Sequence, residues 1–392
     1  MAITQDIKYI GVNDHDIELF EGLYEVPNGI AYNSYLIMDE KIAILDTVDE
    51  GFTDIWLNQL KEQLNGRKPD YLIVQHMEPD HSANILNLLK EYPDTVLVAS
   101  RKAFDMMQNY FGKGYEDQRI SVSNGDKLSL GKHKLEFVEA PLVHWPEVIM
   151  TYDATDKVLF SADGFGKFGT LDLEDDWKEE ARRYYIGIVG KFGMPVQNLL
   201  HKLSTREIHI VCPLHGPVLS ENLEYYFSLY QTWSSYQPEE EGILIAYASV
   251  YGNTEKAMFY LEKKLREKGH KKVYLRDLSR TPMSKNVADA FRYSKLVLAS
   301  TTYNGELFPS MREFLHRLRE RNFCKRTIAF VENGSWAPNA TRFMKELLAK
   351  SSELTYMNTE VRIMSVLNED SARQIEKLAD ELSQELEQEK ER

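Results

Sequence analysis

The sequence predicts an α/β protein of two domains, and three features of the chain support this fold class. Its 392 residues are too many for one ordinary domain. Short apolar runs typical of strands are mixed with helical segments up to residue 237. From residue 242, apolar runs alternate with helices of about 10–15 residues, which is typical of a doubly wound parallel sheet. Domains are therefore expected at residues 1–237 and 242–392.

In the first domain, each expected element follows from an apolar run or from helical spacing. Residues 31–38 and 41–45 flank Asp39-Glu40 as the two strands of a tight hairpin. The other expected strands cover residues 71–74, 96–99, 135–138, 148–152, 158–160 and 208–212. Helices are expected at residues 52–64, around 85–89, and at 221–234.

A linker is expected at residues 236–242, where a proline, a run of glutamates and a glycine follow one another. Beyond it, apolar runs predict strands at residues 242–248, 296–300 and 327–331. Helical spacing predicts helices at residues 255–268, 311–321 and 339–350, and a frayed, charged helix end at 384–392. This alternation of strands and helices is the reason to expect a parallel sheet.

The bulk properties exclude several classes of protein. The formal net charge of −14 disfavours nucleic acid and anionic membrane as partners. No stretch reaches the roughly 18 apolar residues of a membrane helix, and the N-terminus lacks the features of a signal peptide. The two cysteines, Cys212 and Cys324, are far apart and predict neither a disulfide framework nor a thiolate metal site. A cytoplasmic protein is expected.

The segment after the expected strand at 71–74 contains four candidate metal ligands within six residues. These are His76, Glu78, Asp80 and His81. Imidazoles and carboxylates in one loop can hold two metal ions, and a set without thiolate suits iron, manganese or zinc. The alternative is a polar loop with two solvated histidines.

Further ligands are needed to close a site for two metals, and three residues are the best candidates. His144, Asp163 and His215 each follow a strand in a segment bordered by glycine or proline. A single histidine is more often an ordinary structural residue, but three candidates in this order after His76 favour a metal site. His133, in a Gly-Lys-His-Lys turn, and His209 are interpreted as ordinary residues.

The second domain contains three loops suited to a phosphate-bearing ligand with a flat ring. Residues 248–254 join the first strand to the first helix, and their hydroxyl groups and backbone N–H groups can bind an anion. The alternative for this loop alone is an ordinary turn. Residues 300–305 and 332–336 follow later strands, where such sheets bind their ligands, and each loop contains an aromatic residue.

Residues 242 to about 388 resemble a flavodoxin domain, because Ser-x-Tyr-Gly-Asn-Thr matches the FMN phosphate loop of that family. The resemblance implies that FMN phosphate is bound by Ser249, Tyr251, Gly252, Asn253 and Thr254. It implies that the isoalloxazine ring is surrounded by Thr302, Tyr303, Asn304, Gly305, Asn333, Gly334, Ser335 and Trp336.

The first domain resembles the metallo-β-lactamase fold, an αβ/βα sandwich, with Glu78 where hydrolases of that family have histidine. A carboxylate-rich site favours iron over zinc. The two domains together resemble the flavodiiron proteins (A-type flavoproteins), in the two-domain class without a fused rubredoxin. The resemblance implies one iron on His76, Glu78 and His144, another on Asp80, His81 and His215, and Asp163 as the bridge. It leaves open whether His81 binds iron or stands off it.

The resemblance implies an oxidoreductase that reduces dioxygen to water, nitric oxide to nitrous oxide, or both, with electrons from FMN. It also implies a head-to-tail homodimer or a dimer of dimers, and an electron donor such as rubredoxin, a flavin reductase or a deazaflavin. Trp145, beside His144, is a candidate lining residue of the gas pocket or a core tryptophan. Two alternatives remain: a metal-dependent hydrolase with an appended flavodoxin domain, and an electron-transfer or sensing flavoprotein with a vacant metal site.

Overall fold

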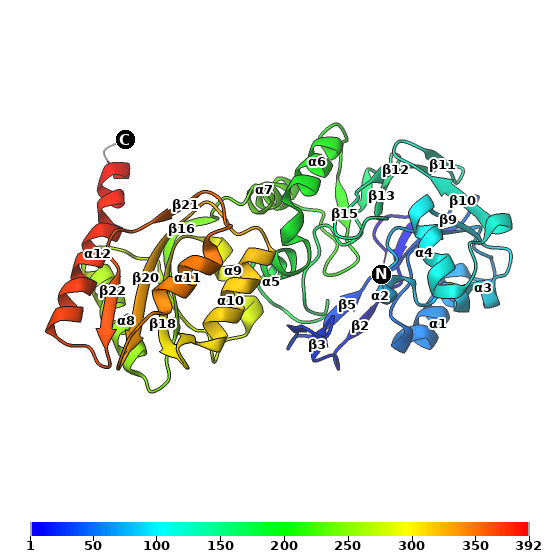
Figure 1. Cartoon of the computed structure of the whole chain (residues 1–392). Helices are drawn as coiled ribbons and strands as arrows, with labels where there is room; N and C mark the ends of the chain where they lie inside the picture. The colour runs from blue at the N-terminus through cyan, green and yellow to red at the C-terminus, as the bar shows by residue number, and fades with distance from the viewer. Residues whose placement is uncertain (1, 391–392) are drawn as a thin grey trace. The chain divides into compact units, whose positions relative to one another are not determined.

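The computed structural model describes residues 2–390, and the chain divides into two compact units between Ser234 and Ser235 (Figure 1). The first unit contains two main sheets. The first sheet has the order β1-β6-β7-β8-β9-β10, with bounds Ile7–Tyr9, Tyr35–Ile37, Ala43–Leu45, Tyr71–Val74, Val96–Ser100 and Arg119–Val122. The second runs from β11 to β15, with bounds Lys127–Ser129, Lys134–Glu139, Ile149–Asp153, Val158–Phe160 and Ile210–Cys212.

The two sheets pack on each other through one apolar core. Ile73 and Val98 of the first sheet belong to the same buried cluster as Phe137 and Phe160 of the second. This packing confirms the predicted sandwich. The helices of this unit are α1 (Thr53–Leu64), α2 (Pro79–Ser82), α3 (Ile85–Glu91), α4 (Arg101–Phe111), α5 (Trp177–Tyr184), α6 (Gly193–Leu203) and α7 (Leu223–Ser234). Of these, α2, α4, α5 and α6 were not foreseen from the sequence, and α2 occupies part of the segment that was expected to be a loop.

The expectation of one strand over residues 31–38 is wrong. The segment forms two strands, because β5 (Ile30–Tyr32) pairs with β2 (Val12–Asp14) while β6 pairs with β1 and β7. The break lies at Asn33, whose buried amide donates hydrogen bonds to the carbonyls of Pro213 and Gly216. The predicted hairpin is confirmed, since β6 and β7 are antiparallel neighbours.

The second unit is a parallel sheet with the order β17-β16-β18-β20-β21, in which β22 also pairs with β20 and the short β19 is antiparallel to β18. This order confirms the predicted doubly wound, flavodoxin-like fold. Its strands are β16 (Glu240–Ala248), β17 (Val273–Asp277), β18 (Tyr293–Tyr303), β19 (Glu306–Leu307), β20 (Arg326–Gly334), β21 (Leu354–Tyr356) and β22 (Val361–Met364). Its helices are α8 (Asn253–Glu267), α9 (Met283–Arg292), α10 (Pro309–Glu320), α11 (Ala340–Leu348) and α12 (Glu369–Lys390).

One expectation about a segment end needs correction. The linker expected at residues 236–242 is shorter, because β16 already begins at Glu240. The helix end expected at residues 384–392 belongs to α12, which is described as far as Lys390, and residues 391–392 lie outside the described part of the chain. Within residues 2–390, no helix combines the length and the hydropathy that crossing a bilayer requires.

His133, interpreted from the sequence as an ordinary turn residue, forms a buried ion pair in the first unit. Its Nδ1 lies 2.9 Å from Asp153 Oδ2, and its Nε2 lies 3.4 Å from Asp6 Oδ2. Burial lowers the pKa of His133, but the hydrogen bond and charge of Asp153 and the contact with Asp6 outweigh burial and raise it. The protonated ring therefore ties the N-terminal segment to β13.

We expect His133→Gln to destabilise the first unit by about 2 kcal/mol at about pH 5.5, and by less at about pH 9. A raised pKa means that the stabilisation is complete below the unfolded histidine pKa of about 6.5, and is lost as the pH rises through the folded value. Urea unfolding across this range measures the difference. The control is His209→Gln, because His209 forms an exposed pair with Glu207 and its loss should change little. If His133→Gln lowered the free energy of unfolding equally at both pH values, the stabilisation would not depend on the protonated His133 ring.

Candidate metal centre

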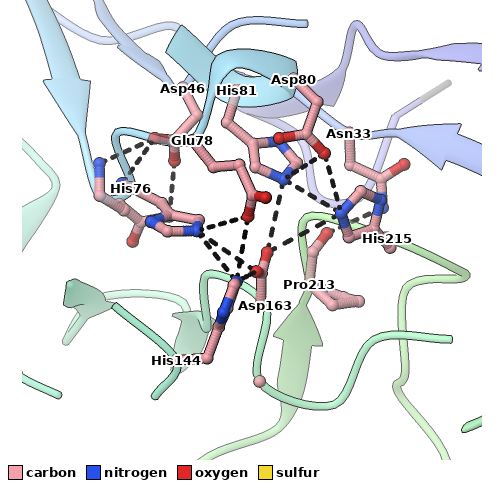
Figure 2. Close-up of polar contacts among 12 residues, drawn as sticks. Asn33, Asp46, His76, Glu78, Asp80, His81, His144, Asp163, Pro213 and His215 are labelled. Atoms are coloured by element: carbon pink, nitrogen blue, oxygen red, sulfur yellow. Dashed lines mark hydrogen bonds and ion pairs between the residues drawn. The ribbon is translucent and has the colours of Figure 1, made fainter. Parts of the chain in front are cut away.

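All predicted metal ligands lie together at the ends of strands and in the loops of the first unit (Figure 2). His76 follows β8, and Glu78 precedes α2, which carries Asp80 and His81. The remaining three come from the second sheet: His144 lies between β12 and β13, Asp163 follows β14, and His215 follows β15. The loop after β8 thus faces three loops that are distant in the sequence.

The first group of ligands contains His76, Glu78, His144 and one oxygen of Asp163. The Nε2 atoms of His76 and His144 are 3.3 Å apart. Glu78 Oε2 lies 3.2 Å from the first of these nitrogens and 3.0 Å from the second. Asp163 Oδ2 completes the group at 2.9 Å from His144 Nε2. Two imidazoles and two carboxylates therefore converge on one point.

The second group contains Asp80, His81 and His215. The Nε2 atoms of the two histidines are 3.1 Å apart, and Asp80 Oδ2 lies 3.3 Å and 3.4 Å from them. Asp163 Oδ1 lies 3.4 Å from His81 Nε2. Asp163 therefore directs Oδ2 at the first group and Oδ1 at the second, so one carboxylate faces both groups.

Hydrogen bonds among these side chains satisfy only some of their polar atoms. Two facing imidazole nitrogens can share only one proton, whereas a metal bound to both at about 2.0–2.1 Å would hold them at this separation. Both oxygens of Asp80 and Oδ1 of Asp163 are buried and accept no hydrogen bond. Buried oxygens of this kind are costly unless a cation or a donor reaches them. The residues therefore fit two metal ions, and their nitrogen and oxygen donors suit iron.

The charges of the groups lead to the same conclusion. Burial would raise the pKa of the Asp163 carboxyl, but His76, His144 and His81 hold it well below its usual range. Burial would lower the pKa of His144, but Asp163 and Glu78 raise it to about 9. Without a metal, protonated imidazoles neutralise the buried carboxylates, and bound cations would replace those protons.

Glu147, which sequence reasoning missed, orients His76. Its Oε1 lies 2.8 Å from His76 Nδ1 and accepts the backbone N–H of Met77 at 2.9 Å. His215 is oriented in a similar way, because its Nδ1 lies 2.8 Å from the carbonyl oxygen of Ala31. His81 differs, since its Nδ1 is buried without a partner. Ligand histidines are normally fixed through their second nitrogen, so the His81 ring is the least constrained of these three.

Tyr184 is a second residue near the metal centre that the sequence did not reveal. It ends α5 directly before a π-helical turn, Tyr185–Val189, a distortion frequent at functional sites. Its ring lies 5.6 Å from that of His215, and its buried hydroxyl has no hydrogen-bond partner. Burial and the charges of Asp163 and Glu78 raise its pKa well above the ordinary value. The phenol therefore keeps its proton beside the carboxylates.

Trp145 packs edge-on against two candidate ligands. Its ring centroid lies 5.2 Å from that of His76 and 6.1 Å from that of His144. The residue is half-buried, so it belongs to the wall of the metal centre and not to the apolar core.

The predicted phosphate and ring loops of the second unit form one pocket where β16, β18 and β20 end. Gly252 has a φ of +80° at the N-cap of α8, a conformation that favours glycine. Gly252, Asn304 and Gly305 lie in adjoining turns and do not line the pocket. Tyr251 and Trp336 are 89% and 82% exposed, so both rings are free to cover a ligand. The lining is Ser249, Val250, Tyr251, Asn253, Thr254, Thr301, Thr302, Tyr303, Asn333, Gly334, Ser335, Trp336 and Ser365.

Two family models match the chain in separate segments. Residues 30–216 match the ODP family beta lactamase, and residues 244–391 match a flavodoxin domain. The first match contains every candidate metal ligand, and the second contains every residue that lines the pocket of the second unit.

Three curated relatives are similar over most of the chain. An uncharacterized protein of Methanocaldococcus jannaschii is 28% identical over 88% of this chain and 88% of its own length. An anaerobic nitric oxide reductase flavorubredoxin of Escherichia coli is 28% identical, over 87% of this chain and 73% of the relative. A diflavin flavoprotein A of Synechocystis is 34% identical over 64% of this chain, but the match spans 45% of that longer protein.

Two solved structures share the whole fold. The flavodiiron protein of Giardia intestinalis has a TM-score of 0.91 at 23% identity, covering 97% of this chain and 95% of that one. The rubredoxin oxygen:oxidoreductase of Desulfovibrio gigas has a TM-score of 0.91 at 23% identity, covering 99% and 98%. The two domains therefore follow one another in this chain in the same order as in these structures.

Proposed function

Because the chain belongs to the flavodiiron protein family, we propose that it reduces dioxygen to water, nitric oxide to nitrous oxide, or both. Its cofactors are FMN in the flavodoxin-like domain and a pair of irons in the lactamase-like domain. The proposal is carried by Asp163, whose two oxygens face two separate ligand groups. The proteins similar to this chain include a nitric oxide reductase and an oxygen oxidoreductase, which supports both substrates.

The proposed division of ligands is supported by the two groups into which they fall. His76, Glu78 and His144 would hold one iron, Asp80, His81 and His215 would hold the other, and Asp163 would contribute to both. When bound, the irons would supply two electrons and a place for one dioxygen or two nitric oxide molecules. The carboxylate of Glu78, in the position of a hydrolase histidine, favours iron over zinc.

Two side chains near the metal centre would help it to bind a small neutral substrate. Tyr184 keeps its proton because its pKa is raised, so its hydroxyl can donate a hydrogen bond to a bound gas. Glu147 holds the His76 ring by its Nδ1 and thereby directs Nε2 at the first iron position. Glu147 positions a metal ligand and Tyr184 donates a hydrogen bond, while the cofactors would carry out the redox steps.

The domain roles follow from the same proposal. Residues 1–237 carry the irons, and residues 242–392 carry FMN, with the phosphate at Ser249 to Thr254 and the ring beside Thr302 to Gly305 and Asn333 to Trp336. We also propose a head-to-tail homodimer, alone or as a dimer of dimers, that brings the FMN of one subunit to the irons of the other. Rubredoxin, a flavin reductase or a deazaflavin would supply the electrons.

Anaerobic stopped-flow spectroscopy tests this function. The fully reduced, iron-analysed protein is mixed separately with dioxygen and with nitric oxide, and the flavin and iron bands are followed. Rapid reoxidation at about two irons and one FMN per chain supports the reductase, and the faster gas identifies the preferred substrate. Inertness toward both gases, or zinc in the site with esterase or thioesterase activity, would favour the hydrolase alternative instead.

A further inference from the structure

A cluster of oxidisable aromatic side chains leads away from the metal centre within the first unit. It consists of Tyr184, Tyr185, Tyr230 and Trp233, here called the aromatic cluster. The Tyr184 ring lies 5.6 Å from His215, and Tyr185, the next residue, lies 5.0 Å from Tyr230 and 5.3 Å from Trp233. Tyr230 and Trp233 are 5.6 Å apart on α7. Ring contacts of this length allow single electrons to pass among Tyr185, Tyr230 and Trp233, and Tyr184 joins this group through the peptide bond to Tyr185.

The aromatic cluster is also joined to the loop that carries Asp163. Phe165, two residues after Asp163, donates its backbone N–H to the Tyr230 hydroxyl at 2.5 Å. The Phe165 ring stacks on the Tyr230 ring, with centroids 4.3 Å apart. Burial raises the pKa of Tyr230, and the charge of Asp163 adds to this effect. The cluster therefore meets the surroundings of the metal ligands at two points: Tyr184 contacts His215, and Tyr230 contacts Phe165 in the loop that carries Asp163.

Packing alone does not explain the choice of these residues. All four are buried, with Trp233 the most exposed at 3%. Phenylalanine would fill nearly the same space as Tyr184 without burying a hydroxyl that has no partner. The feature that tyrosine and tryptophan share, and phenylalanine lacks, is that they give up one electron readily. A redox role would account for this hydroxyl in addition to its proposed hydrogen bond to a bound gas.

We propose that the aromatic cluster donates single electrons to the metal centre when dioxygen reacts while FMN is oxidised. This inference rests on the proposed dioxygen reduction. Complete reduction of dioxygen to water needs four electrons, and the two ferrous ions supply only two without the flavin. The missing electrons would otherwise be taken from the ligands, so the cluster protects His76, His81, His144 and His215.

The step balances when two side chains each lose one electron and one proton. The reactants are two ferrous ions, one dioxygen, two phenol or indole groups and two further protons. The products are two ferric ions, two waters and two neutral aromatic radicals. The O–H or N–H bond of each donor breaks, its electron reduces oxygen, and its proton enters the water formed. A one-electron reductant in solution, such as a thiol, later restores each radical by returning a hydrogen atom.

Rapid-freeze electron paramagnetic resonance tests this inference on the holoprotein. The protein is reduced with limiting dithionite, mixed with excess dioxygen and frozen, once with ordinary and once with ring-deuterated tyrosine. Deuteration narrows a tyrosyl signal but leaves a flavin semiquinone unchanged, so the two radicals are distinguished. We expect a tyrosine-sensitive radical, and after repeated cycles we expect oxygen adducts on Trp233 in peptide mass spectra.

Variants locate the radical. Tyr230→Phe should weaken the tyrosine-sensitive signal, and Trp233→Phe should remove the adducts at position 233 and shorten the life of the protein under repeated cycles. The matched control is Tyr110→Phe, a half-exposed tyrosine on α4. If Tyr230→Phe fails to fold, because Phe165 loses its acceptor, Trp233→Phe decides by the life of the protein under repeated cycles, which should be shorter than that of Tyr110→Phe. A tyrosine-sensitive signal unchanged in a folded Tyr230→Phe, a life unchanged in Trp233→Phe, or a signal lost only in Trp145→Phe overturns the inference.

The test also separates the two proposals. Dioxygen consumption without any tyrosine-sensitive radical overturns the aromatic cluster as an electron donor and leaves the reductase intact. An absence of dioxygen consumption overturns this inference together with the proposed dioxygen reduction, and leaves nitric oxide reduction to the stopped-flow test. Dioxygen consumption with a radical that responds to the cluster variants supports both.

Discussion

Asp163→Asn is expected to lower iron affinity at both metal positions by more than about 100-fold and to abolish gas reduction. Changes in residues that only orient a ligand already cost about 10- to 100-fold, and Asp163 contacts both ligand groups directly. Asparagine keeps the shape but removes the charge that lies among His76, His144 and His81. Iron titration by isothermal calorimetry, with the iron content after purification, measures the loss.

Asp172→Asn provides the matched control, because it makes the same exchange in the same long loop. Asp172 is 56% exposed in its side chain and pairs with His15 on the surface. Iron content and activity should remain at the level of the unmodified protein. An Asp163→Asn protein that keeps both irons would show that the carboxylate does not bridge them.

Glu147→Gln is expected to weaken the first iron position alone, by about 10- to 100-fold. Glutamine can still accept the hydrogen bonds of His76 and Met77, so the fold should survive. The negative charge that makes the His76 ring a stronger ligand is lost. The second position, formed by Asp80, His81 and His215, should keep its affinity. Titration with ferrous iron should therefore resolve two unequal steps.

Glu139→Gln, at the end of β12 and before the same loop, is the control for this exchange. Its side chain is only half-buried and belongs to neither ligand group. Equal weakening of both positions by Glu147→Gln would contradict the selective role, and so would the absence of any effect. Circular dichroism of each variant shows whether the fold is retained.

The metal ligands could be predicted from the sequence because each follows a short apolar strand. In a sandwich, strand ends with their polar loops gather at one end of the sheets, so His76, His144, Asp163 and His215 were found as a set. The doubly wound parallel sheet also followed from the regular alternation of strands and helices, and its likeness to flavodoxin followed from the Ser-x-Tyr-Gly-Asn-Thr loop. These features depend on local patterns, which one sequence contains.

The residues that support the ligands could not be found in this way. Glu147 acts on His76, which lies 71 positions earlier, and no local pattern connects them. Tyr184 depends on the π-helical turn that follows it, and Asn33 breaks a strand through carbonyls near residue 215. The buried role of His133 likewise depends on Asp153 and Asp6, which are distant in the chain. Long-range contacts of this kind appear only once the fold is known.

Mössbauer spectroscopy of the protein loaded with iron-57 tests the central claim most directly, because it reports whether two irons are joined. With Asp163 between them, the oxidised irons are predicted to couple into a diamagnetic pair, with two closely similar quadrupole doublets and no magnetic splitting at low temperature. A spectrum of isolated paramagnetic iron, or iron confined to one of the two positions, would contradict the shared site.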